Sequence, residues 1–422
     1  MNFFEGTVVD NGINGNGIVK NNCVVCFVPF SIKGERVKFE ILRKEKNFCV
    51  CKLNSVIEKS PNRTEPKCKY FGICGGCQLQ HMSKNLQLEF KTNQVKNILS
   101  RALKTNVNVK DCLSANEFHY RNKVNFSISN NKLCFIANDM DKIEVENCPL
   151  FKADLTELIK AINNFISLSN NNFKALHIRI LGKTFQLTFV SNVNEFKQKE
   201  LLISSLENLG IDFSINLSIN KIQNSSNITN CIFNISGEES QTYNILGIEN
   251  KISPSSFLQV NEEVQNMIYE EICDEVKQGK IINAYGGTGF LSSILSRKAG
   301  EVFSIEINQS ASFDCGEMIK RNNLLNIHNI CGDCKVEIPK ILKDETISHI
   351  VFDPPRAGID KSILSLVCSV KIPNLIYLSC NPSTLSRDLK ILCETYEIKE
   401  IQPFDMFPQT SHVETLVKLS CK

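Results

Sequence analysis

Short apolar runs separated by glycines dominate the N-terminal part of the chain. The runs are GTVVD, GIVK, VVCFVPF, ERVKFEIL and FCVCKLNSVI, with Gly12, Gly15, Gly17 and Gly34 between them. Runs of this length bounded by glycine are typical of β-strands. Five such strands within residues 5–57 predict a small OB-like β-barrel, an architecture that often binds single-stranded nucleic acid or oligosaccharide. A purely structural β-domain is equally compatible with the pattern.

The middle of the chain changes pattern twice. After a linker at 60–67, apolar residues recur at helical spacing and predict a helix over residues 84–103. Residues 112–250 then alternate strand-like runs with Asn- and Ser-rich turns, and this pattern predicts an antiparallel α+β region. The strand-like runs are KVNFSIS, ALHIRIL, FQLTFV and INLSI.

From about residue 262 the chain alternates helix and strand. A helical stretch, EEVQNMIYEEICDEV, precedes a strand, a glycine loop, a helix and a second strand in KIINAYGGTGFLSSILSRKAGEVFSIEIN. Buried strands at 348–352 and 374–380 and a closing hairpin follow. This alternation predicts a doubly wound α/β sheet. We therefore expect a multidomain protein with a barrel over 1–57, a central domain over 58–78 and 112–250, and an α/β domain over 79–111 and 251–422.

Composition narrows the environment in which the protein works. The chain of 422 residues is 42% hydrophobic and 22% charged, which is ordinary for a folded domain protein. No run is apolar enough to span a membrane, and the first residues lack the pattern of a secretory signal. The 19 cysteines are therefore expected to be reduced thiols, metal ligands or nucleophiles. We expect a cytoplasmic monomer that binds no membrane.

Three closely spaced cysteines mark a candidate metal centre. Cys68, Cys74 and Cys77 lie within ten residues, with two glycines in the last gap. A fourth ligand must come from elsewhere, and Cys148 is the best candidate because Pro149 restricts the backbone that follows it. Four thiolates suit an iron–sulfur cluster or zinc, although structural zinc sites more often show two CxxC pairs. Clustered free thiols are the alternative.

The glycine loop that follows strand KIINAY marks a candidate nucleoside site. Gly286, Gly287 and Gly289 precede a helix, and Glu306 ends the next strand, where a carboxylate can accept hydrogen bonds from a ribose. The full GxGxxG motif is absent, so a dinucleotide is disfavoured and S-adenosylmethionine fits better. Asp333 follows the next strand and can reach an adenine amino group, or it is simply a turn aspartate.

Three further motifs follow strands of the same α/β domain. FDPPRAG places Asp353 and Arg356 on a turn stiffened by two prolines, which suits recognition of a polar heterocycle. In SCNP, Cys380 ends a strand where α/β sheets place active groups, so its thiol can be a nucleophile. In SHVET, His412 or Glu414 can move a proton, and their spacing places both side chains on one face of a strand.

Together these motifs resemble the bacterial RNA uracil-5-methyltransferases, most closely the 23S ribosomal RNA branch with a TRAM barrel and a 4Fe-4S cluster. The resemblance runs nearly end to end. It rests on FVPFSIKGERVKFEI, SPNRTEPKCKYFGICGGCQLQH, YRNKVNF, SPSSFLQVN, NAYGGTG, DPPRAG, SCNP and HVETL, in family order. Because the related tRNA enzymes are expected to lack the barrel and the cluster, the resemblance favours 23S rRNA as substrate.

The resemblance implies a role for each matched position. Cys68, Cys74, Cys77 and Cys148 match the cluster ligands; Gln259, Tyr285, Glu306 and Asp353, with Asp333 as a weaker fifth, match the S-adenosylmethionine positions; Cys380 matches the nucleophile and Glu414 the base. One departure is Asn283, at a position where the family has aspartate. The loss of this aspartate is expected to weaken cofactor binding without changing the chemistry. The implied substrate is an unpaired uridine flipped out of its stack.

Two other classes of protein share single features with the chain. Radical methylthiotransferases also carry TRAM barrels, but their cysteines follow a CxxxCxxC spacing, and the C-terminal half here does not read as a radical barrel. A non-catalytic RNA-binding protein is the second alternative. The presence of Cys380 and Glu414 argues against it, whereas Asn283 argues for it.

Overall fold

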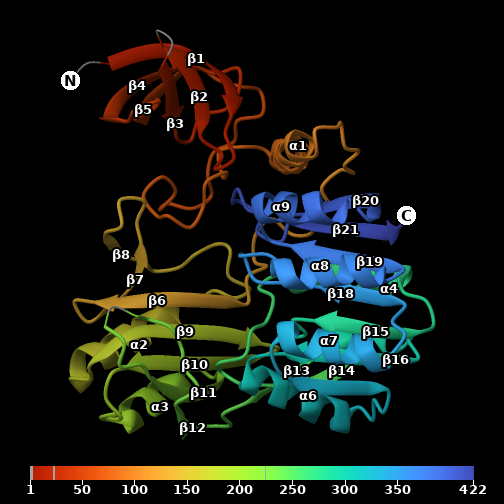
Figure 1. The fold of residues 1–422 in the computed structure, drawn as a ribbon. Helices are drawn as coiled ribbons and strands as arrows, with labels where there is room; N and C mark the ends of the chain where they lie inside the picture. The colour runs from red at the N-terminus through yellow and green to blue at the C-terminus, as the bar shows by residue number, and fades with distance from the viewer. Residues whose placement is uncertain (1–2, 22–23, 224) are drawn as a thin grey trace.

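The computed structural model describes residues 3–21, 24–223 and 225–422. Figure 1 shows a small barrel at the N-terminal end and two larger sheets, one central and one C-terminal, that lie side by side. The expected multidomain architecture with a barrel-like N-terminal sheet is confirmed. Among the helices in this part of the chain, none combines the length and apolar composition needed to cross a membrane.

The barrel contains the strands that the glycine-separated runs predict. Its strands are β1 (Phe3–Asn11), β2 (Gly17–Asn21), β3 (Val24–Val28), β4 (Arg36–Lys44) and β5 (Phe48–Glu58), closed in the order β1-β2-β3-β5-β4. Side chains that point inward, such as Val8, Val19 and Phe39, are almost fully buried. Gly17 is required at a crowded position, because a Cβ there would lie 2.0 Å from Ser31 Oγ.

The central domain is a mixed sheet covered on one face by two helices. The strand order is β12 (Ile232–Ser236), β11 (Asp212–Ile219), β10 (Thr184–Ser191), β9 (Phe173–Leu181), β6 (Lys123–Ser129), β7 (Lys132–Ile136) and β8 (Lys142–Glu144). Helices α2 (Thr156–Ser169) and α3 (Lys199–Asn208) pack their apolar faces on it. The expectation of an antiparallel region is wrong at one pair: β10 and β11 are parallel. Because α3 crosses over between them, the chain enters β11 in the direction of β10.

A hairpin leads into the C-terminal domain. Strands β13 (Gln241–Ile245) and β14 (Ile248–Ile252) pair with each other. The main sheet then has the order β17 (Ile327–Cys331), β16 (Glu301–Glu306), β15 (Lys280–Ala284), β18 (His349–Phe352), β19 (Asn374–Ser379), β21 (Glu414–Cys421) and β20 (Tyr396–Phe404). The first five of these are parallel, and β21 runs antiparallel to both neighbours.

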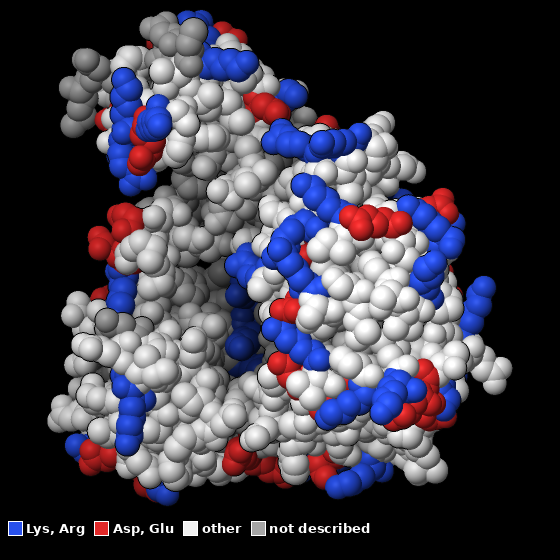
Figure 2. Space-filling view, in the orientation of Figure 1, with Lys and Arg blue, Asp and Glu red and all other residues white. Residues whose placement is uncertain are grey.

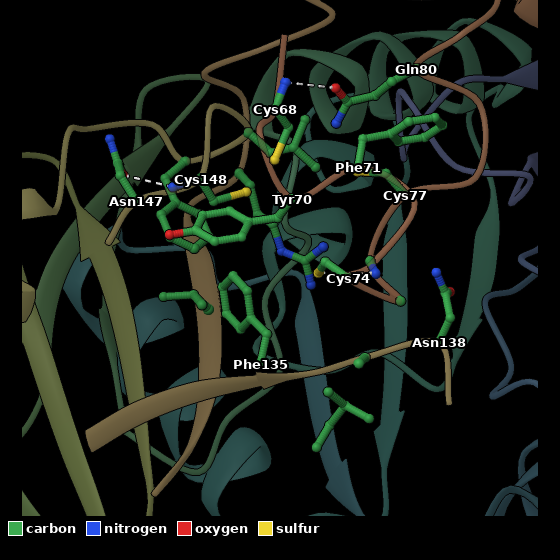
Figure 3. A pocket seen from close by; sticks show the side chains of 18 of the residues that line it. Cys68, Tyr70, Phe71, Cys74, Cys77, Gln80, Phe135, Asn138, Asn147 and Cys148 are labelled. Carbon is green, nitrogen blue, oxygen red and sulfur yellow. Dashed lines mark hydrogen bonds between the residues drawn. The ribbon is translucent and has the colours of Figure 1, made fainter. Parts of the chain in front are cut away.

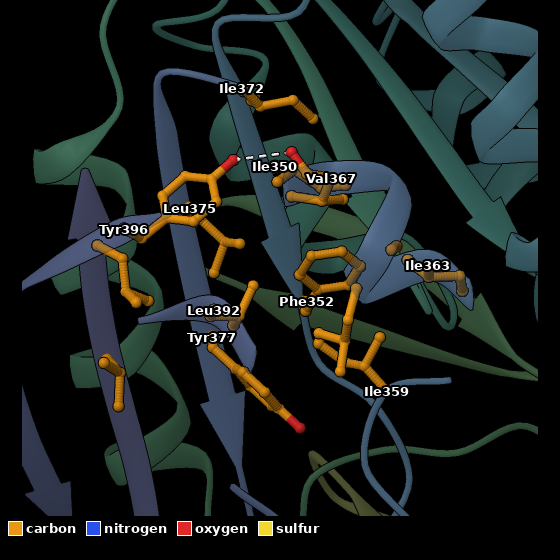
Figure 4. Close-up of a cluster of buried hydrophobic side chains, with 14 of the residues drawn as sticks. Ile350, Phe352, Ile359, Ile363, Val367, Ile372, Leu375, Tyr377, Leu392 and Tyr396 are labelled. Carbon is orange, nitrogen blue, oxygen red and sulfur yellow. Dashed lines mark hydrogen bonds between the residues drawn. The ribbon is translucent and has the colours of Figure 1, made fainter. Parts of the chain in front are cut away.

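Helices cover both faces of this sheet, as a doubly wound fold requires. They are α4 (Glu262–Glu275), α5 (Phe290–Leu295), α6 (Gln309–Arg321), α7 (Cys334–Asp344), α8 (Lys361–Val370) and α9 (Pro382–Leu392). Successive buried residues Ile281 and Ile282 belong to separate apolar clusters, one on each face. Figure 4 shows the cluster that contains Phe352 and Leu375, where the Tyr396 hydroxyl donates a 3.1 Å hydrogen bond to the Val367 carbonyl.

The predicted helix over 84–103 is α1 (Lys84–Leu103). It precedes the central sheet in the chain. Ser83 caps it, since its hydroxyl accepts a hydrogen bond from the Leu86 main chain. The helix packs on α9, and Val95 and Leu99 are buried in a cluster of the C-terminal sheet. Helix α1 is therefore part of the C-terminal domain, and the chain forms the central sheet before it completes that domain.

Candidate active site

Four loops at one edge of the C-terminal sheet gather most of the predicted site. Tyr285, Glu306, Asp353 and Cys380 each lie at or just beyond the carboxyl end of β15, β16, β18 or β19. These strands are neighbours in register, with Ala284 beside both Ile305 and Phe352. Ligands of open α/β sheets bind at this edge, outside the carboxyl ends of the strands.

The glycine loop is held by Glu306. The main-chain N–H groups of Gly287 and Asn308 donate hydrogen bonds of 2.9 and 2.6 Å to its two carboxylate oxygens. Gly289 has a positive φ of 87°, and a Cβ there would lie 2.4 Å from Cys315 Sγ, so only glycine fits. Tyr285 is itself held at a φ of 63°, in the left-handed region that non-glycine residues rarely adopt. The loop is therefore held in one backbone conformation by Glu306 and by its own positive-φ residues.

Asn283 lies beneath this loop and has polar partners. It is 1% exposed, its amide nitrogen donates a 2.8 Å hydrogen bond to Ser292 Oγ, and Ser292 in turn donates to Ser304 Oγ at 2.8 Å. Its carboxamide oxygen has no partner among the described residues. The residue that departs from the family pattern therefore occupies surroundings made of neutral polar groups.

The remaining cofactor candidates lie in different settings. Asp333 caps α7, since its side chain accepts a 2.9 Å hydrogen bond from the Lys335 main chain, as a turn aspartate would. Gln259 is buried in the 253–261 loop, whose main chain accepts a hydrogen bond from Asn122. The groups that hold this loop in place could not be identified from the sequence pattern. They are a buried arginine, Arg179, which donates to the Ser253 and Ser256 carbonyls, and Asp314, which accepts from both serines.

Cys380 and Glu414 are brought together by antiparallel pairing. Ser379, the last residue of β19, pairs with Thr415 of β21, which places Cys380 beside Glu414. Burial raises the pKa of Cys380 to about 11, and the Glu414 charge contributes to the increase. Burial, together with the Asp353 charge, raises the pKa of Glu414 well above its usual range. In both cases the Arg356 guanidinium opposes the increase, so a cation faces the thiol and the carboxyl.

Asp353, Arg356 and His412 complete this end of the site. Burial and the Glu306 charge raise the pKa of Asp353 to about 7. The Arg356 Nη2 lies 3.2 Å from His412 Nδ1. His412 is exposed and precedes β21, whereas Glu414 is 4% exposed. The two side chains share the neighbour Arg356, but only Glu414 is enclosed.

Helix α9, which follows Cys380, clamps the loop that carries Asp353 and Arg356. Asn381 and Thr384 donate to the Arg356 carbonyl at 3.3 and 3.2 Å. Asp388, fully buried, accepts hydrogen bonds from the Ile359 main chain at 2.9 Å and from the Tyr377 hydroxyl at 2.7 Å. The loop that carries Cys380 and the DPPRAG loop are therefore parts of one hydrogen-bonded unit, which the sequence pattern did not reveal.

The four cysteines of the predicted metal centre line one pocket of about 490 Å³, shown in Figure 3. Burial raises the pKa of the Cys77 thiol to about 12 and that of Cys148 to about 11, and other thiols of the group add to both increases. Within the described residues, however, no three or more His, Cys, Asp or Glu side chains are arranged to hold a metal ion. The metal-site prediction is not confirmed and stays a prediction.

Polar groups around the thiol pocket fit an anionic sulfur-rich occupant. Gln80 is 4% exposed and accepts a 3.1 Å hydrogen bond from the Cys68 main chain. Its amide nitrogen has no hydrogen-bond partner among the described residues. Arg121 also lines the pocket, and its charge lowers the pKa of Cys148. An unpaired donor and a cation beside four thiols are the contacts that thiolates or sulfide would accept.

Known proteins show which family this arrangement belongs to. The C-terminal residues 335–422 match the family model described as tRNA (Uracil-5-)-methyltransferase. An uncharacterized RNA methyltransferase of Clostridium acetobutylicum is 35% identical over 99% of this chain and 96% of its own length. Another, from Protochlamydia amoebophila, is 32% identical over 98% and 97%. The chain belongs to the RNA uracil-5-methyltransferase family. The segment that matches the family model contains Asp353, Cys380 and Glu414.

A solved structure resembles this uracil-5-methyltransferase family member over nearly its whole length. The tRNA (uracil-54, C5)-methyltransferase of Pyrococcus abyssi, solved with S-adenosyl-L-homocysteine, superposes with a TM-score of 0.79 and 24% identity, covering 98% of this chain and 99% of that one. The likeness therefore includes most of the N-terminal barrel. The expectation that related tRNA enzymes lack a barrel is wrong for the Pyrococcus abyssi enzyme. The presence of a barrel therefore does not distinguish between RNA substrates.

Proposed function

We propose that the protein transfers a methyl group from S-adenosylmethionine to C5 of a uracil in RNA, with 23S rRNA as substrate. The observation that carries the proposal is the pairing that sets Cys380 beside Glu414, at the sheet edge that also holds Glu306 and Asp353. A nucleophile, a proton acceptor and carboxylates for a nucleoside are the groups that this reaction requires.

The cofactor would lie over the glycine loop. Glu306 uses one lone pair of each oxygen for Gly287 and Asn308, which leaves lone pairs for two ribose hydroxyls. The Asp333 carboxylate accepts one hydrogen bond from α7 at Oδ1, and its remaining acceptor capacity is available to an adenine amino group. Tyr285, Gln259 and Asp353 are the other proposed contacts. S-adenosylmethionine, when bound, supplies an electrophilic methyl group.

The chemistry explains why the site holds a thiol. Uracil C5 is too weak a nucleophile to attack a methyl group directly. When the Cys380 thiolate bonds to C6, the ring becomes an enolate, and C5 can form the new carbon–carbon bond. Glu414 then accepts the C5 proton, the bond between Sγ and C6 breaks, and the C5–C6 double bond returns. Arg356 favours the thiolate, since its charge lowers the pKa of Cys380.

Cys68, Cys74, Cys77 and Cys148 are the proposed ligands of a 4Fe-4S cluster. In such a cluster each thiolate binds a different iron, so the sulfurs need to surround a cavity rather than converge on one point. The four thiols lie on the walls of one pocket, and this observation supports the proposal. Gln80 and Arg121 are placed to satisfy the negative charge of the sulfur atoms.

The RNA would enter between the domains. Figure 2 shows a hollow between the central and C-terminal parts, with Lys and Arg side chains on its wall. Positive charge in a hollow attracts the phosphate backbone. We propose that residues 1–57 form a TRAM barrel, that residues 58–78 and 112–250 bind RNA and the cluster, and that residues 79–111 and 251–422 form the methyltransferase domain. An unpaired uridine must leave its stack to reach the enclosed thiol.

A methylation assay with two RNAs tests the proposal. Unmodified 23S rRNA and unmodified tRNA are each incubated with the protein and methyl-labelled S-adenosylmethionine, and the products are identified as nucleosides. We expect 5-methyluridine in 23S rRNA and none with the Cys380→Ser variant. Label in tRNA alone would assign the second candidate substrate, which the Pyrococcus abyssi likeness favours. Cofactor binding without any 5-methyluridine would contradict the activity.

A further inference from the structure

The loop between β20 and β21, residues 405–413, leads directly into Glu414. Within this loop, Gln409 is buried, with 2% of its surface exposed, and its backbone is in the left-handed region with a φ of 71°. A non-glycine residue in the left-handed region persists only when its surroundings fix it. The contacts that hold Gln409 therefore also determine where the chain enters β21.

The segment that carries the cysteines supplies two of these contacts. The main-chain N–H groups of Gln78 and Leu79, which directly follow Cys77, both donate 3.0 Å hydrogen bonds to the Gln409 carbonyl. Helix α1 supplies two more through Gln87, which donates to the Gln409 side chain at 3.0 Å and accepts from its main chain at 3.1 Å.

A fifth contact comes from the other side of the thiol pocket. The Tyr120 hydroxyl donates a 3.1 Å hydrogen bond to the Pro408 carbonyl. Tyr120 is buried in a small apolar cluster with Cys77 and Leu150, against which Cys148 packs. Two of the proposed ligands, Cys77 and Cys148, thus lie against groups that hold the loop.

We propose that the cysteine centre positions Glu414: the segment wrapped around the centre holds Pro408 and Gln409, so that emptying the centre releases the 405–413 loop and slows removal of the C5 proton. The inference rests on the proposed function, since it requires an occupant bound by the thiols and a base at Glu414. Methyl transfer itself depends on Cys380 and the cofactor loops, which α9 and Glu306 hold without help from the cysteine segment.

Hydrogen exchange tests the coupling without any RNA. The amides of 405–413 are compared in the iron-loaded protein and after iron removal by a chelator, with residues 280–306 as an internal reference. We expect exchange of the loop to become at least about tenfold faster, the effect of losing roughly one hydrogen bond. Unchanged loop exchange after iron removal overturns the proposal, and because no catalysis is needed, it does so independently of the methylation assay.

A pair of tyrosine variants separates coupling from general destabilisation. Tyr120→Phe removes the bond to Pro408 and leaves the thiols untouched, whereas Tyr396→Phe removes an equivalent buried bond of 3.1 Å to Val367. We expect Tyr120→Phe, but not Tyr396→Phe, to speed exchange of the loop and to accumulate a methylated protein–RNA adduct, with iron content unchanged. Identical behaviour of the two variants overturns the proposal.

Discussion

The Gly287 main chain, in the loop after β15, donates a 2.9 Å hydrogen bond to Glu306 at the end of β16. One carboxylate therefore shapes the glycine loop and still has free lone pairs. Asn308 holds the second oxygen of the same group. In the proposed function, loop shape and ligand recognition therefore depend on the same side chain.

Replacement of Glu306 by alanine should weaken S-adenosylmethionine binding by about 1–3 kcal/mol, because the ribose hydroxyls lose an acceptor and Gly287 loses its partner. Glu306→Gln keeps one acceptor oxygen and should lose less. Calorimetry measures both affinities. Equal affinity in wild type and Glu306→Ala would move the ribose site to another group.

Asn283→Asp should destabilise the protein. The resemblance alone favours equal or tighter cofactor binding, but the fully buried Asn283 donates to Ser292, and a carboxylate cannot donate. Burial of the introduced carboxylate without a neighbouring cation should lower the free energy of unfolding by about 1–3 kcal/mol at pH 8. The loss should be smaller at pH 5, where the new carboxyl is protonated. Asn283→Ala is the control, since its stability loss should not depend on pH. Urea unfolding at both pH values measures the difference.

Local signals in the sequence predicted much of the fold. The helix expected over 84–103 is α1 at Lys84–Leu103, because its apolar spacing and the Ser83 cap are both readable in a short window. The parallel pairing of β10 and β11 was not readable, because direction depends on where α3 returns the chain. The residue pattern of these strands, in Asn- and Ser-rich sequence, does not indicate whether two strands pair in parallel or antiparallel.

The candidate site also has one part that the sequence could predict and another part that it could not. Cys380, Glu306 and Asp353 could be placed because they end or follow strands whose carboxyl ends meet at one edge. Glu414 lies at the same edge because it begins β21, which runs antiparallel to β19. The groups that position these residues could not be placed from the sequence. The Tyr120 hydroxyl reaches a carbonyl 288 residues away, and only the assembled domains bring the two together.

The reactivity of Cys380 should increase with pH and depend on Arg356. Because the pKa of Cys380 is raised to about 11, the thiolate fraction grows about tenfold per pH unit between pH 7 and 10. Arg356→Met removes the cation that lowers this pKa and should slow alkylation of Cys380 by iodoacetamide about tenfold at pH 8. Mass spectrometry follows the Cys380 peptide, with the exposed Cys231 as internal reference. Equal rates in both proteins would show that Arg356 does not act on the thiol.

Asp353 should make stability depend on pH. Its folded-state pKa is raised to about 7 by burial and by Glu306, above an unfolded value of about 3.9. The stabilising contribution of the protonated carboxyl is therefore complete below about pH 4 and is lost as the pH rises through 7. Without cofactor, Asp353→Asn should gain about 1–3 kcal/mol over wild type between pH 4 and 8, a range discounted for partial exposure. A difference that does not vary with pH in urea unfolding would assign the raised pKa to another group.

Loss of Glu414 should trap the reaction after methyl transfer. Glu414→Gln keeps the shape of the side chain but cannot accept the C5 proton, so addition of Cys380 and methyl transfer proceed while elimination stalls. A covalent protein–RNA adduct carrying the labelled methyl group should accumulate and migrate as a slow band on a denaturing gel. Cys380→Ala is the control and should form no adduct, although RNA and cofactor still bind. His412 lies beside Arg356 and is the alternative base, so an adduct in His412→Ala together with normal turnover of Glu414→Gln would reassign the proton to the histidine.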